Sequence, residues 1–183
     1  MKNDQPGKLS ETAVIGLVNE SFGGKATVVC AAGGMPGELL RLWRPEDPKA
    51  YHLEYGYSCM GYEIPGGLGV KLAEPDREVV VMVGDGSYLM MNSEIVTAVA
   101  EGIRITIVLV DNHGFQCILG LQRAVGVVQG TELGRNGEAV SRRVQDNCRL
   151  CPHLTGRFGH PLCRIEGNRD RLSSPYRSPA QHP

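Results

Sequence analysis

The fold is decided by one stretch of the chain, Val79-Val80-Val81-Met82-Val83-Gly84-Asp85-Gly86-Ser87. Its apolar part, counted from Glu78 to Val83, is continuous and rich in β-branched residues, which is typical of a strand buried on both faces. Residues Tyr88 to Glu101 then predict a helix, and Gly102 is placed to cap its C-terminus. A second apolar strand follows from Ile103 to Val110. A strand, a helix and a strand without a hairpin turn predict a right-handed crossover within a parallel sheet.

The same alternation begins earlier in the chain. Ser10 to Glu20 carries apolar residues at helical spacing behind a serine cap, and Ala26 to Ala31 is a further buried strand. Pro36 can open a helix from Gly37 to Trp43, and Gly61 to Ala73 predicts a glycine-rich helix whose small residues permit close packing. The predicted fold class is therefore α/β, a doubly wound parallel sheet, followed by an irregular C-terminal tail.

The composition excludes several kinds of partner. The chain has 183 residues, and its 19 basic and 20 acidic side chains give a formal net charge of -1, which favours neither nucleic acid nor an anionic membrane surface. The apolar runs have the length of strands and fall well short of the roughly 20 residues that a membrane helix needs. The first residues contain no apolar signal segment. These features predict a cytoplasmic protein with no membrane or nucleic-acid partner.

The chain changes character near Gly126, so we divide it into residues 1–126, a partial cofactor domain, and residues 127–183, the tail. Arginine, glycine and proline dominate the tail, and disorder is the expectation from about Asn136 onward. A frameshifted or truncated reading frame would explain the abrupt loss of periodicity, a hypothesis that translating the other frames would test. The tail also holds zinc-ligand residue types at irregular spacing, which accidental clustering explains as well: Cys148, Cys151, His153, His160 and Cys163.

Three glycine-rich loops are predicted to meet at the carboxyl ends of the strands, where ligands bind in such sheets. They are Gly33 to Gly37, Gly84 to Ser87 and Asp111 to Phe115. The last two offer the Asp85 carboxylate and the Asn112 amide oxygen, and such oxygen ligands suit Mg²⁺ better than zinc. A lone Gly-Asp-Gly is usually only a turn, but Asn112 follows Asp85 by 27 residues (112 − 85), so one strand–helix–strand unit brings both to one edge.

On these residues the chain resembles the thiamine diphosphate-dependent enzymes, whose motif runs from Gly-Asp-Gly to an asparagine. The resemblance implies that Asp85, Asn112 and the main-chain oxygen of Gly114 hold Mg²⁺. The segment Tyr57 to Gly67 resembles the part of that family that places a bulky apolar residue, here Met60, beneath the cofactor. The resemblance also implies that the Ser58 carbonyl accepts a hydrogen bond from the amino group of the cofactor. The predicted cofactor-binding residues are Gly34, Met35, Ser58, Met60, Gly84, Asp85, Gly86, Ser87, Asn112, Gly114 and Phe115.

The segments His52 to Glu63 and Asp85 to Met91 are similar to one branch of the family, the ring-opening hydrolases that act on the cyclic diketone trihydroxycyclohexane-1,2-dione in inositol catabolism. The family implies a catalytic glutamate from the pyrimidine-binding domain of a neighbouring subunit in a homo-oligomer. Glu54, Glu63 and Glu94 do not stand in the context that the family uses, so no catalytic residue is predicted here. The chain then carries half of an active site and is expected to be inactive alone.

Three other interpretations stay open. The chain could belong to another thiamine diphosphate enzyme of the acetolactate synthase or decarboxylase type. It could be a non-catalytic remnant that serves as an assembly module, in which case Asp85 and Asn112 need not keep binding geometry. A nicotinamide-binding domain is the third, but no Gly-x-Gly-x-x-Gly follows the first strand and no acidic residue ends the second at the ribose position.

Overall fold

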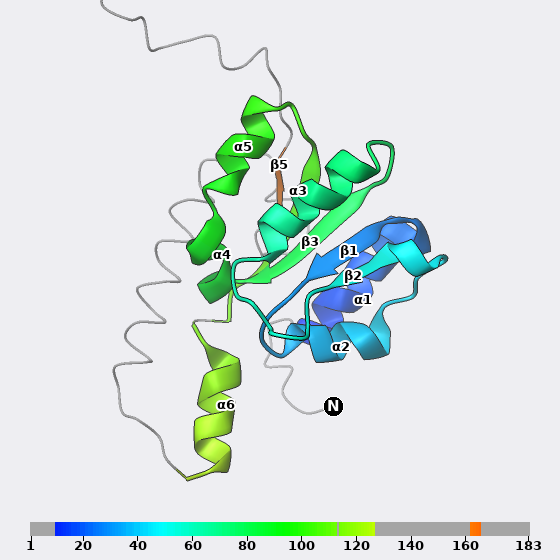
Figure 1. Ribbon diagram of the computed structural model, residues 1–183. Coiled ribbons are helices and arrows are strands. Elements are labelled where there is room, and N and C mark those ends of the chain that lie inside the picture. Colours follow the sequence, from blue (N-terminus) through cyan, green and yellow to red (C-terminus); the bar gives the residue numbers. More distant parts are fainter. Residues whose placement is uncertain (1–9, 113, 127–161, 166–183) are drawn as a thin grey trace, which may run out of the picture.

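The computed structural model describes residues 10–112 and 114–126, together with the main chain of 162–165. Its centre is a five-stranded sheet in the order β2-β1-β3-β4-β5 (Figure 1). The first four strands are mutually parallel, and β5 runs antiparallel to β4. The strands are β1 (Thr27–Cys30), β2 (Tyr51–Leu53), β3 (Val79–Gly84), β4 (Ile105–Val110) and β5 (Leu162–Ile165).

Six α-helices and two short 3-10 helices connect these strands in the described part of the chain. No helix there is both long and apolar enough to cross a membrane. The α-helices are α1 (Glu11–Phe22), α2 (Met35–Leu42), α3 (Glu63–Ala73), α4 (Asp85–Met91), α5 (Glu94–Ala100) and α6 (Gln116–Ala124), and the 3-10 helices are η1 (Gly23–Lys25) and η2 (Pro48–Ala50).

The alternation of side chains along β3 divides the core into two layers, one on each face of the sheet. Val79, Val81 and Val83 pack with side chains of α3, α4 and α5, whereas Val80 and Met82 pack with side chains of α1 and α2. All five side chains are buried, and the strand is therefore apolar at every position instead of alternating between apolar and polar residues. The doubly wound α/β fold predicted from the sequence is confirmed.

The order of the strands creates the crevice in which the site lies. From β1 the chain passes to β2 on one side, and it then crosses to β3 on the other side of β1. The connections leaving β1 and β3 therefore diverge, and a crevice opens between them at the carboxyl edge of the sheet. The loops after β1, β3 and β4 all begin at this edge, because these strands are parallel.

Most of the predicted elements are present. The Ser10 hydroxyl accepts a hydrogen bond from Ala13 N and caps α1, as predicted. Pro36 stands in the first turn of α2, and Pro65 in the first turn of α3, where a missing N–H costs least. The predicted helix from Tyr88 to Glu101 differs, because it is broken between α4 and α5 at Asn92 and Ser93. The side chains of both residue types compete for main-chain hydrogen bonds and favour helix ends.

Two strands lie outside the prediction. β2 is only three residues long and was not predicted; it pairs with β1 at the edge of the sheet. β5 falls within the tail, where no regular element was expected, and its main chain pairs with the otherwise free edge of β4. Pairing of that kind satisfies main-chain groups that an edge strand leaves open. The remaining tail and the boundary at Gly126 lie outside what the structure describes, as do four of the five zinc-type residues and the side chain of the fifth, Cys163.

Candidate functional site

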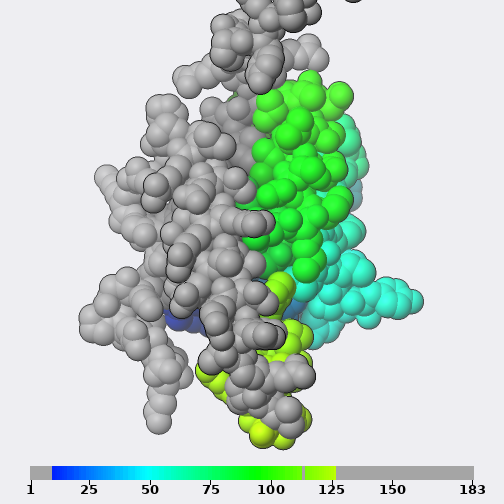
Figure 2. Space-filling view, turned by 90° about the vertical axis from the view of Figure 1, so that its left-hand side faces the viewer, coloured from blue at the N-terminus to red at the C-terminus, as the bar shows by residue number. Residues whose placement is uncertain are grey.

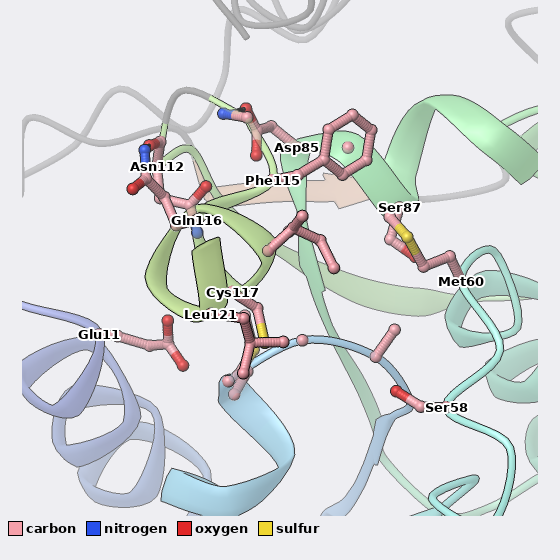
Figure 3. Close-up of a pocket in the computed structure, with 18 residues that line it drawn as sticks. Glu11, Ser58, Met60, Asp85, Ser87, Asn112, Phe115, Gln116, Cys117 and Leu121 are labelled. Atoms are coloured by element: carbon pink, nitrogen blue, oxygen red, sulfur yellow. Dashed lines mark hydrogen bonds between the residues drawn. The ribbon is translucent and has the colours of Figure 1, made fainter. Parts of the chain in front are cut away.

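A cavity of about 330 Å³ opens at the carboxyl edge of the sheet, between the loops that follow β1, β3 and β4 (Figure 3). This volume lies within the range of small-molecule sites. All the residues predicted to bind the cofactor line this one cavity, and they come from four separate segments of the chain: Gly34, Met35, Ser58, Met60, Gly84, Asp85, Gly86, Ser87, Asn112, Gly114 and Phe115. The structure thus brings these residues together, and their roles stay predictions.

Asp85 is the first residue of α4, directly after β3, and its side chain is almost fully buried at 1% exposure. Its Oδ2 accepts a hydrogen bond of 2.7 Å from Gly114 N, so the carboxylate joins the loops after β3 and β4. Burial raises the pKa of Asp85, and the charge of Asp111 adds to that rise, whereas the Gly114 N–H opposes it. A buried carboxylate without a full positive countercharge is costly, and a bound cation would supply one.

The Asn112 side chain has one amide end 3.1 Å from Asp85 Oδ1 and 2.6 Å from the Gly114 carbonyl oxygen. With nitrogen at that end, the amide donates to both oxygens. With oxygen there, three oxygens converge with no donor among the three groups, an arrangement that suits a bound cation. Gly114 reaches this position with φ of +117°, which a residue with a Cβ rarely adopts. The same three groups can therefore close on each other or hold a hard cation.

The kind of metal that this set fits follows from its donors. One carboxylate, one amide oxygen and one main-chain carbonyl leave room for water and phosphate oxygens, as Mg²⁺ requires. Within residues 10–112 and 114–126, no group of three or more His, Cys, Asp and Glu side chains is placed to hold a metal. A metal here would therefore rest on the mixed set and on oxygens of a bound ligand, rather than on a zinc-type cluster.

Phe115 forms one wall of the cavity by packing against the bare main chain of Gly86. A Cβ added to Gly86 would lie 2.6 Å from Cε1 of the ring, which is too close for any real contact. Gly86 therefore allows the aromatic ring to approach α4 at its first turn (Figure 3). At Gly84, on the other side of Asp85, an added Cβ would meet no atom within 4 Å.

Ser58 and Met60 form another wall and come from the segment between β2 and α3. Ser58 has φ of +51°, and it is the one non-glycine residue in the described part of the chain with a positive φ. Met60 is 37% exposed although it is large and apolar. A side chain of this kind on a cavity wall is suited to contact an apolar part of a ligand.

The buried carboxylate of Glu63 connects the loops that form the cavity. This residue was not predicted from the sequence to belong to the site. Glu63, at 1% exposure, accepts hydrogen bonds from Ala32 N at 3.3 Å, Gly61 N at 3.0 Å and the Ser87 hydroxyl at 2.7 Å. Ser87 Oγ in turn accepts from Gly61 N at 2.7 Å. The available clue in the sequence was a glutamate at the start of a mostly apolar, glycine-rich helix.

Further lining residues were not predicted to bind the cofactor, and most of them come from α1 and α6. Glu11 of α1 reaches the cavity, and its pKa is raised mainly by burial and further by the charge of Glu38. The first turns of α6 add a mixed polar and apolar wall. No motif marks the positions in α1 and α6, because these helices lie outside the cofactor motif. Ala32 and Gly33 instead follow β1, and Gly33 opens the predicted loop Gly33 to Gly37. The residues in question are Glu11, Ala32, Gly33, Gln116, Cys117, Ile118 and Leu121.

Comparison with known proteins places this site in context. The family described as thiamine pyrophosphate enzyme, C-terminal TPP binding domain, matches residues 31–150. The match therefore continues past Gly126, where the sequence suggested a boundary, and that boundary stays a prediction. Among solved structures, a thiamine diphosphate-dependent 4-hydroxybenzoylformate decarboxylase from Rhodococcus jostii superposes with a TM-score of 0.63 over 76% of this chain and 28% of its own. At 18% identity this likeness shows the fold alone.

Curated relatives are much closer in sequence. A protein from Geobacillus thermodenitrificans named 3D-(3,5/4)-trihydroxycyclohexane-1,2-dione hydrolase is 57% identical over 120 residues, which are 66% of this chain and 19% of the relative. A protein of the same name from Shouchella clausii is 53% identical over 115 residues, or 63% of this chain and 18% of the relative. The chain thus spans about a fifth of the length of the curated relatives that it matches.

Proposed function

The chain belongs to the thiamine pyrophosphate enzymes, as part of their C-terminal cofactor-binding domain, and from this premise we propose that its cavity holds thiamine diphosphate through one Mg²⁺. Asp85, Asn112 and the main-chain oxygen of Gly114 are the proposed metal ligands. The observation that carries the proposal is the position of the Asn112 amide, which can turn its oxygen toward Asp85 Oδ1 and the Gly114 carbonyl. When bound, Mg²⁺ neutralises the charge of the diphosphate.

The loop after β1 and the start of α2 are proposed to receive phosphate oxygens. Gly33 has φ of +88°, and a Cβ there would meet nothing within 4 Å, so the main chain faces open space. No side chain caps the first turn of α2, which begins at Met35 behind Gly34. The positive end of the helix dipole favours an anion at such a position, although Pro36 has no N–H and Gly37 N already donates to the Gly34 carbonyl. Gly84, Gly86 and Ser87 complete the proposed diphosphate side of the cavity.

The opposite wall is proposed to receive the rings of the cofactor. Met60 would support them from below, and the Ser58 carbonyl would accept a hydrogen bond from the amino group of the pyrimidine. Phe115 adds an apolar surface beside the metal ligands. The roles of these residues rest on the family resemblance together with their placement around one cavity.

We further propose that the whole protein hydrolyses a trihydroxycyclohexane-1,2-dione, as the names of the relatives suggest, with opening of the ring, and that it does so in the cytoplasm. In this proposal a neighbouring subunit supplies the pyrimidine-binding domain and the glutamate that acts on it. This chain contributes the metal ligands, the phosphate-binding main chain and the wall under the rings.

The proposal is tested by calorimetric titration of thiamine diphosphate into the purified chain with Mg²⁺ and with a chelator. Asp85→Asn keeps the shape of the side chain but removes the only charged metal ligand. We expect it to weaken Mg²⁺-dependent binding by at least about tenfold, the low end of what lost metal-site partners cost.

The matched control is Asp76→Asn, because Asp76 is an exposed carboxylate that contributes nothing to the cavity. It should bind as the unmodified chain does. If a folded chain bound no cofactor, the assembly-module interpretation would replace this proposal. If Asp85→Asn bound as well as the control, Asp85 would not be a metal ligand.

A further inference from the structure

The wall formed by Ser58 and Met60 belongs to an exposed segment of the surface. Its neighbours Tyr55 and Tyr57 are 61% and 91% exposed, so little apolar packing holds the segment in place. The positive φ of Ser58 adds a conformation that serine disfavours. Some other interaction has to keep this part of the cavity in shape.

Glu54 provides that interaction at the start of the segment. Its Oε1 accepts from Tyr57 N at 3.0 Å and its Oε2 accepts from Cys59 N at 2.6 Å, so the carboxylate bridges the two residues on either side of Ser58. We call this pair of hydrogen bonds from Tyr57 N and Cys59 N to the Glu54 carboxylate the Glu54 clamp. The main chain of Glu54 is also held in place, because Glu54 N donates to the Cys30 carbonyl at the end of β1. The two main-chain N–H groups also lower the pKa of Glu54, as expected for bonds that favour the charged form.

Glu63 holds the other end of the same segment. It binds Gly61 N, directly after Met60, and links it to Ala32 beyond β1 and to Ser87 in α4. None of the ion pairs found among the described residues involves Glu63, so its partners are these neutral donors. Buried polar groups that are fully hydrogen-bonded in this way specify one arrangement of the elements that they join.

We propose that Glu54 and Glu63 are positioning residues that hold the Ser58–Met60 wall in its ligand-binding shape before any cofactor arrives. Neither carboxylate was predicted to take part in binding, and Glu54 does not line the cavity. The inference rests on the proposed function for the identity of the ligand. It goes beyond it by assigning the shape of the ring side of the cavity to two carboxylates that act through the main chain.

The first arm of the test needs no ligand. Amide hydrogen exchange is compared in the unmodified chain, in Glu54→Gln, in Glu63→Gln and in the control Glu101→Gln, an exposed carboxylate beyond the end of α5. In Glu54→Gln the amide nitrogen replaces one acceptor, so Tyr57 N or Cys59 N should exchange faster by at least about tenfold, as the loss of a charge-assisted bond implies. The amides of β3 and β4 should keep their protection. Unchanged exchange in the segment would overturn the proposal.

The second arm separates positioning from general support of the fold. Thiamine diphosphate and inorganic diphosphate, each with Mg²⁺, are titrated into the same proteins. In Glu54→Gln the affinity for thiamine diphosphate should fall by about tenfold, while that for inorganic diphosphate stays within about twofold, because only the rings contact the displaced wall. Equal losses for both ligands, or no loss for either, would overturn the positioning role.

The two proposals fail in different ways. If the unmodified chain and Glu101→Gln bind neither probe, the proposed function falls, and the cofactor role of the clamp falls with it. If they bind both probes and Glu54→Gln does not differ from them, only the present inference falls. Glu54→Gln carries the decision because Glu54 is partly exposed, whereas loss of the buried Glu63 carboxylate can unfold the chain.

Discussion

Ser58 shows how the chemistry of one residue depends on its neighbours. Its φ of +51° is uncommon for serine, and both flanking amides are taken up by the Glu54 carboxylate. Strained main chain of this kind persists only where surrounding contacts require it, and it is concentrated at functional sites. At this scale the site is defined by hydrogen bonds to the main chain as much as by side chains that face the cavity.

The Glu54 carboxyl group should titrate at a lower pH in the folded chain than in the unfolded one. The main-chain bonds from Cys59 and Tyr57 lower its pKa below the ordinary value of 4.5. The stabilisation from these bonds is therefore fully present above the unfolded pKa, and it is lost as the pH falls through the lowered folded pKa. The measurement is the NMR shift of the Glu54 carboxyl carbon against pH, repeated in urea. Equal midpoints in the two states would contradict the clamp.

Asp85 and Glu63 illustrate two uses of a buried carboxylate. Asp85 lies beside Asn112 and the Gly114 carbonyl, where a cation would offset its charge. Glu63 instead receives three neutral donors and needs no cation. A buried carboxylate is thus a proposed metal ligand at Asp85 and a proposed positioning residue at Glu63. The difference lies in the number of hydrogen-bond donors around each carboxylate.

At the scale of elements, the packing of α3 on the sheet sets where the Met60 wall stands. Gly67 faces β3, and a Cβ there would overlap Cγ2 of Val81. Gly69 lies at an exposed position of the same helix, and a Cβ added there would meet no atom within 4 Å. The small residues of this helix were predicted to permit close packing, and Gly67 is where the packing requires one.

The two glycines give a matched pair of substitutions. Gly67→Ala should lower the free energy of unfolding by about 1–3 kcal/mol, because an added methyl group forces α3 away from β3. Gly69→Ala should raise it by roughly 0.5–1 kcal/mol, because alanine reduces the entropy lost when the helix forms. Urea unfolding of the cofactor-free chain measures both. Similar changes in the two variants would show that α3 does not pack on β3 as described.

At the scale of the whole molecule, apolar side chains are exposed along the helices beside the cavity. In Figure 2, α4 and α5 (green) run down the molecule and α6 (yellow-green) lies beneath them. Within the described residues α6 buries no side chain. The exposed large apolar residues of these helices and of the position after α6 are Met90, Met91, Val96, Ile118, Leu121 and Val125. Apolar surface of this kind beside a site is typical of contact with another domain, which agrees with the proposed half-site.

The purified chain alone is expected not to open the ring of trihydroxycyclohexane-1,2-dione. The proposed mechanism needs a glutamate from another domain, and Glu54 and Glu63 are committed to main-chain and hydroxyl donors. The measurement is consumption of the dione with saturating thiamine diphosphate and Mg²⁺, using a full-length relative as the positive control. Turnover by the chain at more than a trace of the control rate would show that the half-site interpretation is wrong.

The sequence by itself determined the fold class and identified the motif residues that line the cavity. Short continuous apolar runs rich in β-branched residues, such as Val79 to Val83, favour strands covered on both faces. The spacing from Asp85 to Asn112 brings two side-chain oxygen donors to one edge of a parallel sheet. The apolar runs are local patterns, and the spacing reflects a single strand–helix–strand crossover, so both can be recognised directly in the sequence.

Only the tertiary structure decided which other groups complete the site. Glu63 accepts hydrogen bonds from Ala32 and Ser87, and Glu11 of α1 and Leu121 of α6 both reach the cavity although they are far apart in the sequence. The break between α4 and α5, the short strand β2 and the pairing of β5 with β4 belong to the same class. Contacts between segments far apart in sequence depend on how helices and strands pack, and no local periodicity records that packing.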